Sequence, residues 1–149
     1  MRKSITEVER LFAKGLDAIK NGDMVSALVH FEKVVKLDNS PTNRSYHAFC
    51  VARERGQFKK SISICEELLK EEPDNPIHYL NLGRIYVLAG QKTEAMRILR
   101  EGLTHEENRE IVAELIELGM RKPPILPLLK RQNPLNRYLG IVLTKLGLR

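Results

Sequence analysis

The sequence predicts an all-α solenoid, in which short antiparallel helix pairs stack one on the next. Two observations carry this prediction. First, Gly22, Gly56 and Gly90 lie 34 residues apart, and each supplies the positive φ or the close approach that a helix connection requires. Second, Ser40 and Asn75 each stand directly before a proline. A capping side chain followed by proline at the first helical position marks the start of a helix.

The helices follow from these starts and stops and from apolar residues at helical spacing. Neither helix of a pair can bury its apolar stripe alone, so neighbouring pairs must cover it. Three pairs are about the minimum that buries a continuous core. No strand pattern competes with this interpretation. Helices are expected near residues 4–21, 24–38, 41–55, 58–72, 76–89, 92–104 and 107–119.

The segment from Tyr79 to Leu99 is the clearest copy of the repeated unit. Gly83 and Ala95 are small residues at the point where two antiparallel helices would cross, so the backbones can approach closely. The segment resembles a tetratricopeptide repeat, whose pattern W-x₂-L-G-x₂-Y, A-x₃-F and P recurs every 34 residues. Tyr79 and Leu99 replace the two aromatic residues of the pattern. The residues that match it are Leu82, Gly83, Tyr86 and Ala95.

The resemblance implies a right-handed superhelix over residues 1–119, with repeats at about 8–41, 42–75 and 76–109 and then a capping helix. It also implies a non-catalytic protein–protein interaction module, an adaptor or scaffold that takes a peptide or partner protein in its concave groove. The first helix of each pair lines that groove in the family. By register, the lining residues are expected to be Phe12, Leu16, Ile19, Tyr46, Cys50, Arg53, Leu80, Arg84 and Val87.

One subclass of the family binds the C-terminal carboxylate of chaperones through basic and amide side chains. A carboxylate needs several charge-assisted donors, and this chain has lost them, so a chaperone tail is not expected. We expect instead an apolar peptide anchored by Arg53 or Arg84; alternatively, part of the apolar set is interhelix packing. The positions that match the subclass hold Phe12, Leu16, His47, Ile77 and Asn81.

The C-terminal segment 120–149 differs in charge, because it holds seven Lys or Arg and no Asp or Glu. The net charge of +6 therefore comes entirely from it. Three interpretations are open: a helix packed on the solenoid, which we expect; a homodimer contact; or, as the alternative function, binding to an anionic surface of membrane lipid or nucleic acid. Its apolar stripe is formed by Leu135, Tyr138, Leu139, Val142, Leu143 and Leu146.

The composition and the motifs exclude other classes. At 149 residues, 42% hydrophobic and 30% charged, the chain has the composition of one soluble domain. It has no secretory signal pattern and no apolar run of about 18 residues, so we expect a cytoplasmic protein. The four histidines lack metalloprotease spacing, and Cys50 and Cys65 lack CxxC spacing. No enzyme activity, metal or cofactor is expected, and Cys65 is expected to be a buried free thiol.

Overall fold

The computed structural model describes residues 5–119, 141 and 144–147. These residues contain seven α-helices and no strand. The chain divides after Leu118 into two units, and all seven helices belong to the first. The helices are α1 (Glu7–Lys20), α2 (Met24–Leu37), α3 (Pro41–Arg55), α4 (Phe58–Glu71), α5 (Pro76–Leu88), α6 (Lys92–His105) and α7 (Arg109–Glu117).

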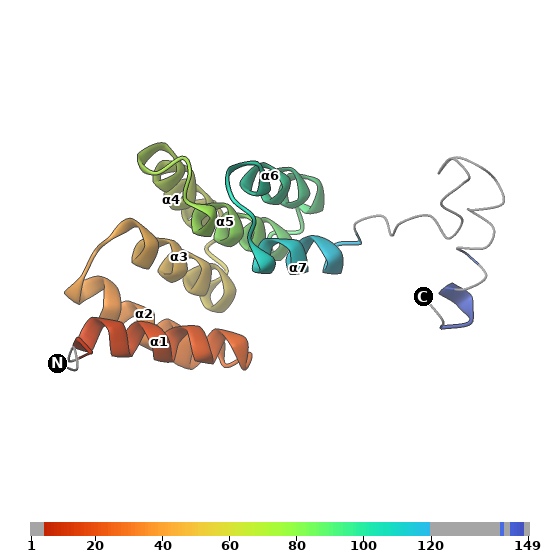
Figure 1. Cartoon of the computed structure of the whole chain (residues 1–149). Helices are drawn as coiled ribbons and strands as arrows, with labels where there is room; N and C mark the ends of the chain where they lie inside the picture. Colours follow the sequence, from red (N-terminus) through yellow and green to blue (C-terminus); the bar gives the residue numbers. More distant parts are fainter. Residues whose placement is uncertain (1–4, 120–140, 142–143, 148–149) are drawn as a thin grey trace. The chain divides into compact units, whose positions relative to one another are not determined.

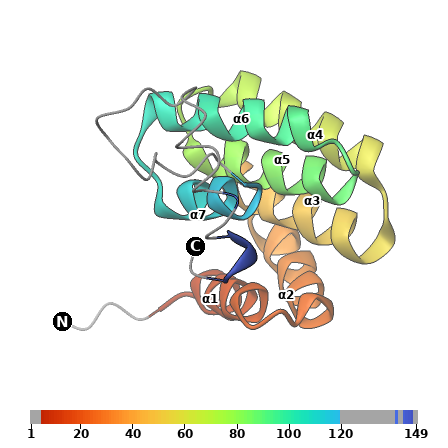
Figure 2. The same ribbon diagram turned by 90° about the vertical axis from the view of Figure 1, so that its right-hand side faces the viewer.

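Six of the helices form three antiparallel pairs, and α7 follows the third pair (Figure 1, Figure 2). Within the pairs, α1 packs on α2, α3 on α4 and α5 on α6. Successive pairs join because α2 packs on α3, and because α3 and α4 both pack on α5. Helix α7 packs mainly on α6. The predicted all-α solenoid of antiparallel pairs is therefore confirmed. Its largest fully buried side chains include Phe31, Leu68, Leu80, Leu82, Ile85 and Leu99.

The helix ends follow the predicted signals closely. Gly22, Gly56 and Gly90 have φ values of 77°, 65° and 75°, which is the left-handed conformation that favours glycine at a helix end. Helix α1 begins at Glu7 and not near residue 4, because Thr6 caps it. The Thr6 hydroxyl accepts from the backbone N–H of residue 9, and the side chain of that glutamate accepts from the Thr6 N–H, which is a capping box.

The two predicted cap–proline pairs are both helix starts, but only one forms the expected bond. Asn75 Oδ1 accepts a hydrogen bond of 3.0 Å from the backbone N–H of Ile77. Ser40 occupies the N-cap of α3, yet its side chain makes no capping hydrogen bond. The start of α3 therefore rests on the fixed φ of Pro41 at the first helical position.

Small residues set the crossing points within the helix pairs. A Cβ added at Gly83 would lie 2.5 Å from the Leu99 side chain, and one at Gly15 would lie 2.6 Å from the Phe31 ring. The close approach expected at Gly83 is therefore confirmed. The second pair reverses the sizes, with Phe49 at the glycine position and Cys65 at the large position. In the first and third pairs, a large side chain on the second helix thus faces a glycine on the first.

The predicted C-terminal helix lies mainly outside the described residues. Residues 141, 144 and 145 are helical. Of the predicted apolar stripe only Leu146 is described, and its side chain is 66% exposed. Among the described residues, no helix is long and apolar enough to cross a membrane.

Candidate partner-binding site

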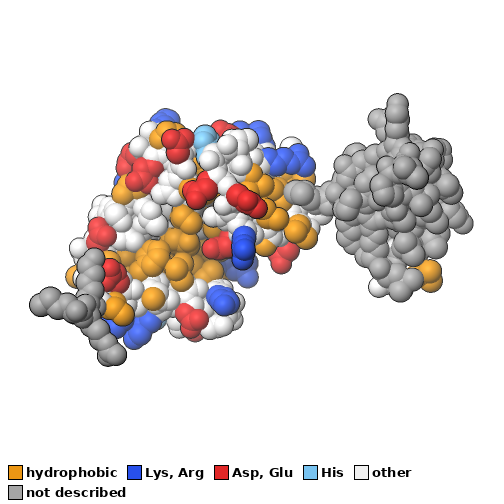
Figure 3. Space-filling view, viewed as in Figure 1, with side chains coloured by type: hydrophobic (Ala, Val, Ile, Leu, Met, Phe, Trp, Pro, Cys, Tyr) orange, Lys and Arg blue, Asp and Glu red, His pale blue; other side chains and the backbone are white. Residues whose placement is uncertain are grey.

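The first helix of each pair, together with α7, lines the face of the first unit that we call the concave face. Figure 3 shows hydrophobic side chains gathered over α3, between α1 and α5. Helix α1 contributes to this face because it has two apolar sides. One side, which includes Leu11, Gly15 and Ala18, is buried. The other recurs at helical spacing and is half-buried; we call it the α1 stripe, and it consists of Val8, Phe12, Leu16 and Ile19.

The α1 stripe keeps exposed surface because α1 joins the stack through α2, whereas α3 packs directly on α5. Three aromatic rings fill the space between α1 and α3. Phe12 meets Phe31 and Tyr46 edge-on, with ring centroids 5.6 and 5.4 Å apart. Tyr46 is stacked on Phe31 at 5.3 Å. We call these three rings the aromatic cluster; Phe12 belongs to both the cluster and the α1 stripe, and joins the stripe to Phe31 and Tyr46.

Six of the nine predicted lining residues keep accessible surface: the half-buried Arg84 and five others. Of these five, the three on α1 are half-buried and the other two are exposed. Arg53 has no ion pair with any described residue, so its charge is free. The five are Phe12, Leu16, Ile19, Arg53 and Val87.

Three of the predicted lining residues are buried instead. Cys50 and Leu80 have no exposed surface, and Tyr46 is 4% exposed. Helices α3 and α5 pack closely enough to enclose Cys50 and Leu80. Contrary to the sequence-based expectation, these two side chains belong to the core and present no surface to a partner.

Arg84 has contacts that the sequence analysis did not predict. Its Nε donates to Glu114 Oε1 at 2.7 Å, and its Nη2 donates to Glu110 Oε2 at 3.1 Å. Its guanidinium also lies over the Phe49 ring, 5.4 Å from the centroid. The side chain is only 14% exposed. Arg84 therefore joins α5 to α7 and α3, and its charge is neutralised within the chain.

Glu110 and Glu114 are two residues of the concave face that the sequence analysis did not predict. A signal for them was present, because Asn108 stands 33 residues after the N-cap Asn75 and caps α7 by accepting from the Ile111 N–H at 3.0 Å. At that spacing, α7 holds the same position in the repeat as α1, α3 and α5, each of which is the first helix of a pair, and it lies beside α5. Two carboxylates four residues apart then share one face. The sequence analysis treated this helix only as a cap.

Tyr46 has a polar group in an otherwise apolar setting. Burial raises the pKa of Tyr46 to about 12, and the nearby carboxylate of Glu110 contributes in the same direction, while Arg84 opposes it. The Tyr46 hydroxyl makes no hydrogen bond to any described residue. It is therefore a neutral donor without a protein acceptor in the part of the chain that the structure describes.

The cysteines do not form a reactive site. Both are free and buried, which confirms the prediction for Cys65. Burial raises the pKa of Cys50 and that of Cys65 to about 12, so both thiols stay protonated at neutral pH. Within the described residues, no three His, Cys, Asp or Glu side chains are grouped to hold a metal ion.

Comparison with known sequences identifies the repeat. A profile described as tetratricopeptide repeat matches residues 52–118. The chain is 33% identical over 81 residues to a pentatricopeptide repeat-containing protein of Arabidopsis thaliana, covering 51% of this chain and 19% of that protein. It is 29% identical over 86 residues to the photosystem I assembly protein Ycf3 of Synechococcus sp. (strain CC9605), covering 56% and 50%. The chain spans half or less of the length of these two relatives.

Solved structures agree on the fold. A thermophilic tetratricopeptide repeat protein of Thermus thermophilus superimposes with a TM-score of 0.61 at 20% identity, covering 78% of this chain and 66% of that one. The first such domain of Spaghetti (RPAP3), bound to an HSP90 peptide, has a TM-score of 0.54 at 20% identity and covers 80% and 95%. The seven helices therefore have the fold of tetratricopeptide repeat domains, and residues 52–118 match the model of that family.

Proposed function

We propose that this chain is a non-catalytic interaction module that holds an apolar peptide segment or partner protein on its concave face, at the end formed by α1 and α3. The observation that carries the proposal is the half-buried α1 stripe, whose Phe12 packs against Tyr46 of α3 in the aromatic cluster. Contiguous apolar surface of this kind on a helical domain marks an interaction site. Covering it releases about 25 cal/mol for each Å² of apolar area removed from water.

The opposite end of the concave face is less suited to a partner. There Glu110 and Glu114 already form ion pairs with the guanidinium of Arg84. Binding energy at the α1 end therefore comes from apolar burial, with the exposed Arg53 of α3 as the charged anchor. Of the two polar anchors in the sequence-based hypothesis, Arg53 and Arg84, this assignment retains Arg53.

A chaperone carboxylate is not proposed as the ligand, although one structural neighbour is bound to an HSP90 peptide. Two positions that would need donors hold the apolar Phe12 and Leu16. A third holds Asn81, which is fully buried and donates through Nδ2 to Ser45 Oγ at 3.0 Å. A terminal carboxylate would lose its water and gain too few charge-assisted hydrogen bonds in return.

The proposal is tested by placing a charge in the α1 stripe. Leu16→Asp should abolish partner recovery in a pull-down from the source cell, because the carboxylate would be desolvated beneath an apolar ligand. Val25→Asp is the matched control, since Val25 is 63% exposed on α2, outside the concave face. It should recover the same partner as wild type.

Both variants should first be shown to melt within a few degrees of wild type, so that lost binding is not lost folding. If Leu16→Asp recovers every wild-type partner, the α1 stripe is not the binding surface and the proposal is wrong.

A further inference from the structure

His47 lies on α3 at a position that holds a paired polar residue one repeat later. That later residue is Asn81, whose Nδ2 donates to Ser45 Oγ at 3.0 Å. One repeat before Ser45 the chain has Leu11, which offers no polar side chain. Nε2 of His47 is buried and has no hydrogen-bond partner among the described residues. Both ring nitrogens of a charged imidazole are donors, so protonation would leave a buried, charged N–H without an acceptor.

The surroundings of His47 oppose its protonation. Burial lowers the pKa of His47 below its ordinary value of 6.5. Glu32 on α2 acts in the opposite direction, whereas Arg55 on α3 and Lys60 on α4 lower the pKa further. Glu32 also forms an ion pair with Arg55. The carboxylate that would favour a charged ring is therefore already paired with a cation.

Other ionisable groups on the helices packed against α3 are engaged elsewhere or exposed. On α5, Arg84 is held by two carboxylates of α7, and His78 Nε2 lies 2.8 Å from Glu72 Oε2. The two lysines of α2 are exposed. On α2, His30 also has a buried nitrogen without a partner among the described residues, Nδ1, and it therefore requires its own control.

The contact between α2 and α3 fixes the first helix pair. The third pair is joined to the second through two helices, because α3 and α4 both pack on α5. The first pair is joined to the second mainly by α2 on α3. Its α1 stripe therefore keeps its place beside α3 only while this contact holds. A charge forced into the contact would act on the first pair as a unit.

We propose that His47 makes the joint between the first and second helix pairs sensitive to acid: the first pair is held on α3 while the ring is neutral and loosens from it when the ring is charged. The inference goes beyond the proposed function and does not depend on a partner. Because the α1 stripe moves with α1, the concave face keeps its geometry near neutral pH and loses it under mildly acidic conditions.

The direction of the effect follows from the linkage between protonation and folding. Because the pKa of His47 is lowered in the folded chain, the unfolded chain binds this proton more tightly. The stabilising contribution of the neutral ring is present above pH 6.5 and is lost as pH falls through the folded-state pKa. The carboxyl groups of Asp23 and Glu72 have pKa values lowered from 3.8 and 4.5, so they titrate at more acidic pH.

Hydrogen exchange of the full chain at about pH 7.5 and about pH 5.5 tests the inference, with rates corrected for the intrinsic effect of pH on exchange. We expect acidification to lower the protection of α1 and α2 several-fold more than that of α5 and α6. His47→Gln keeps a neutral polar side chain but cannot take up the proton, so it should remove most of that difference. His30→Gln is the matched control and should keep the wild-type response.

The imidazole NMR signals of His47 in the wild-type chain supply a second measurement that needs no variant. Their titration midpoint should lie below 6.5 and should coincide with the loss of protection in α1 and α2. The inference is wrong if α1 and α2 lose no more protection than α5 and α6, or if the ring titrates at or above 6.5. It is equally wrong if His47→Gln keeps the wild-type response or if His30→Gln alone abolishes it.

Discussion

The two contacts between successive helix pairs are built from different chemistry. Where the first pair meets the second, three rings pack together, with Phe12 and Tyr46 around the fully buried Phe31. Where the second pair meets the third, Asn81 Nδ2 donates to Ser45 Oγ at 3.0 Å, and both side chains are fully buried. The same scaffold thus uses an apolar contact at one end and a directional polar one at the other.

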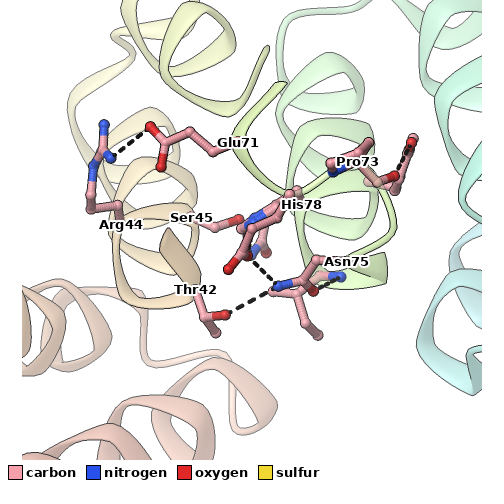
Figure 4. Close-up of polar contacts among 11 residues, drawn as sticks. Thr42, Arg44, Ser45, Glu71, Pro73, Asn75 and His78 are labelled. Carbon is pink, nitrogen blue, oxygen red and sulfur yellow. Dashed lines mark hydrogen bonds and ion pairs between the residues drawn. The ribbon is translucent and has the colours of Figure 1, made fainter. Parts of the chain in front are cut away.

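The polar contact extends to the helix starts. Figure 4 shows Asn75, the N-cap of α5, reaching Thr42 on α3. Its Nδ2 donates to Thr42 Oγ1 at 3.3 Å and to Glu72 Oε2 at 2.9 Å, and that carboxylate also meets Nε2 of the fully buried His78 at 2.8 Å. Directional bonds fix how α3 and α5 align. The aromatic contact leaves the α1 stripe free, which is why we place the partner there.

The largest expected effect comes from removing the centre of the aromatic cluster. Phe31→Ala should lower the free energy of unfolding by about 3–5 kcal/mol, because it empties a fully buried site between two rings. Chemical denaturation measures this. Val29→Ala is the matched control on the same helix, at 44% exposure, and should change stability by less than about 0.5 kcal/mol. A loss below about 1 kcal/mol for Phe31→Ala would show that the cluster does not hold the first pair.

The polar contact should respond differently to single and double replacement. Asn81→Ala leaves the buried Ser45 hydroxyl without this donor and should cost about 1–3 kcal/mol. Ser45→Ala combined with Asn81→Leu removes both polar partners, and should recover most of that loss, since Asn81 Oδ1 is already unpaired. Denaturation of the three proteins forms the comparison. A double variant less stable than Asn81→Ala would mean that the hydrogen bond itself supplies the stability.

The ion pairs at the far end of the concave face should contribute less. Arg84→Met keeps an unbranched side chain on α5 but removes the guanidinium that lies over Phe49, and it leaves the carboxylate of Glu114 without its partner. We expect a loss of about 1–2 kcal/mol, because Arg84 is mostly buried while Glu110 is 58% exposed. Hydrogen exchange should show the loss as faster opening of α7. Unchanged exchange in α7 would mean that apolar packing of Ile111 and Leu115 alone holds this helix.

The smallest effect is confined to alkaline pH. Because the folded-state pKa of Tyr46 is raised from 10.0 to about 12, the folded chain keeps this proton longer than the unfolded chain does. The associated stability is fully present below pH 10 and is lost as pH rises towards 12. Tyr46→Phe should therefore flatten the fall of unfolding free energy across that window. An identical fall in both proteins would contradict the assignment.

The sequence was sufficient for the fold because its signals are local. The glycines at 22, 56 and 90 and the prolines after residues 40 and 75 act within one turn of chain. The site was only partly predictable, because exposure depends on neighbours far along the sequence. Register placed Cys50 and Leu16 in equivalent positions, yet only Leu16 stays accessible. The partners of Arg84 lie 26 and 30 residues further along the chain, on α7. Helix propensity predicts that α7 forms but not how it is oriented against α5.

The accessibility of the α1 stripe can be measured directly, without a partner. A soluble paramagnetic chelate broadens NMR signals in proportion to their exposure, so methyl-labelled full-length chain reports each site separately. We predict strong broadening for the methyl groups of Leu16 and Ile19, and little for those of Leu80, which occupies the corresponding face of α5 and is fully buried. If Leu16 and Ile19 are shielded as well as Leu80 is, the two ends of the concave face do not differ and the placement of the partner at α1 is contradicted.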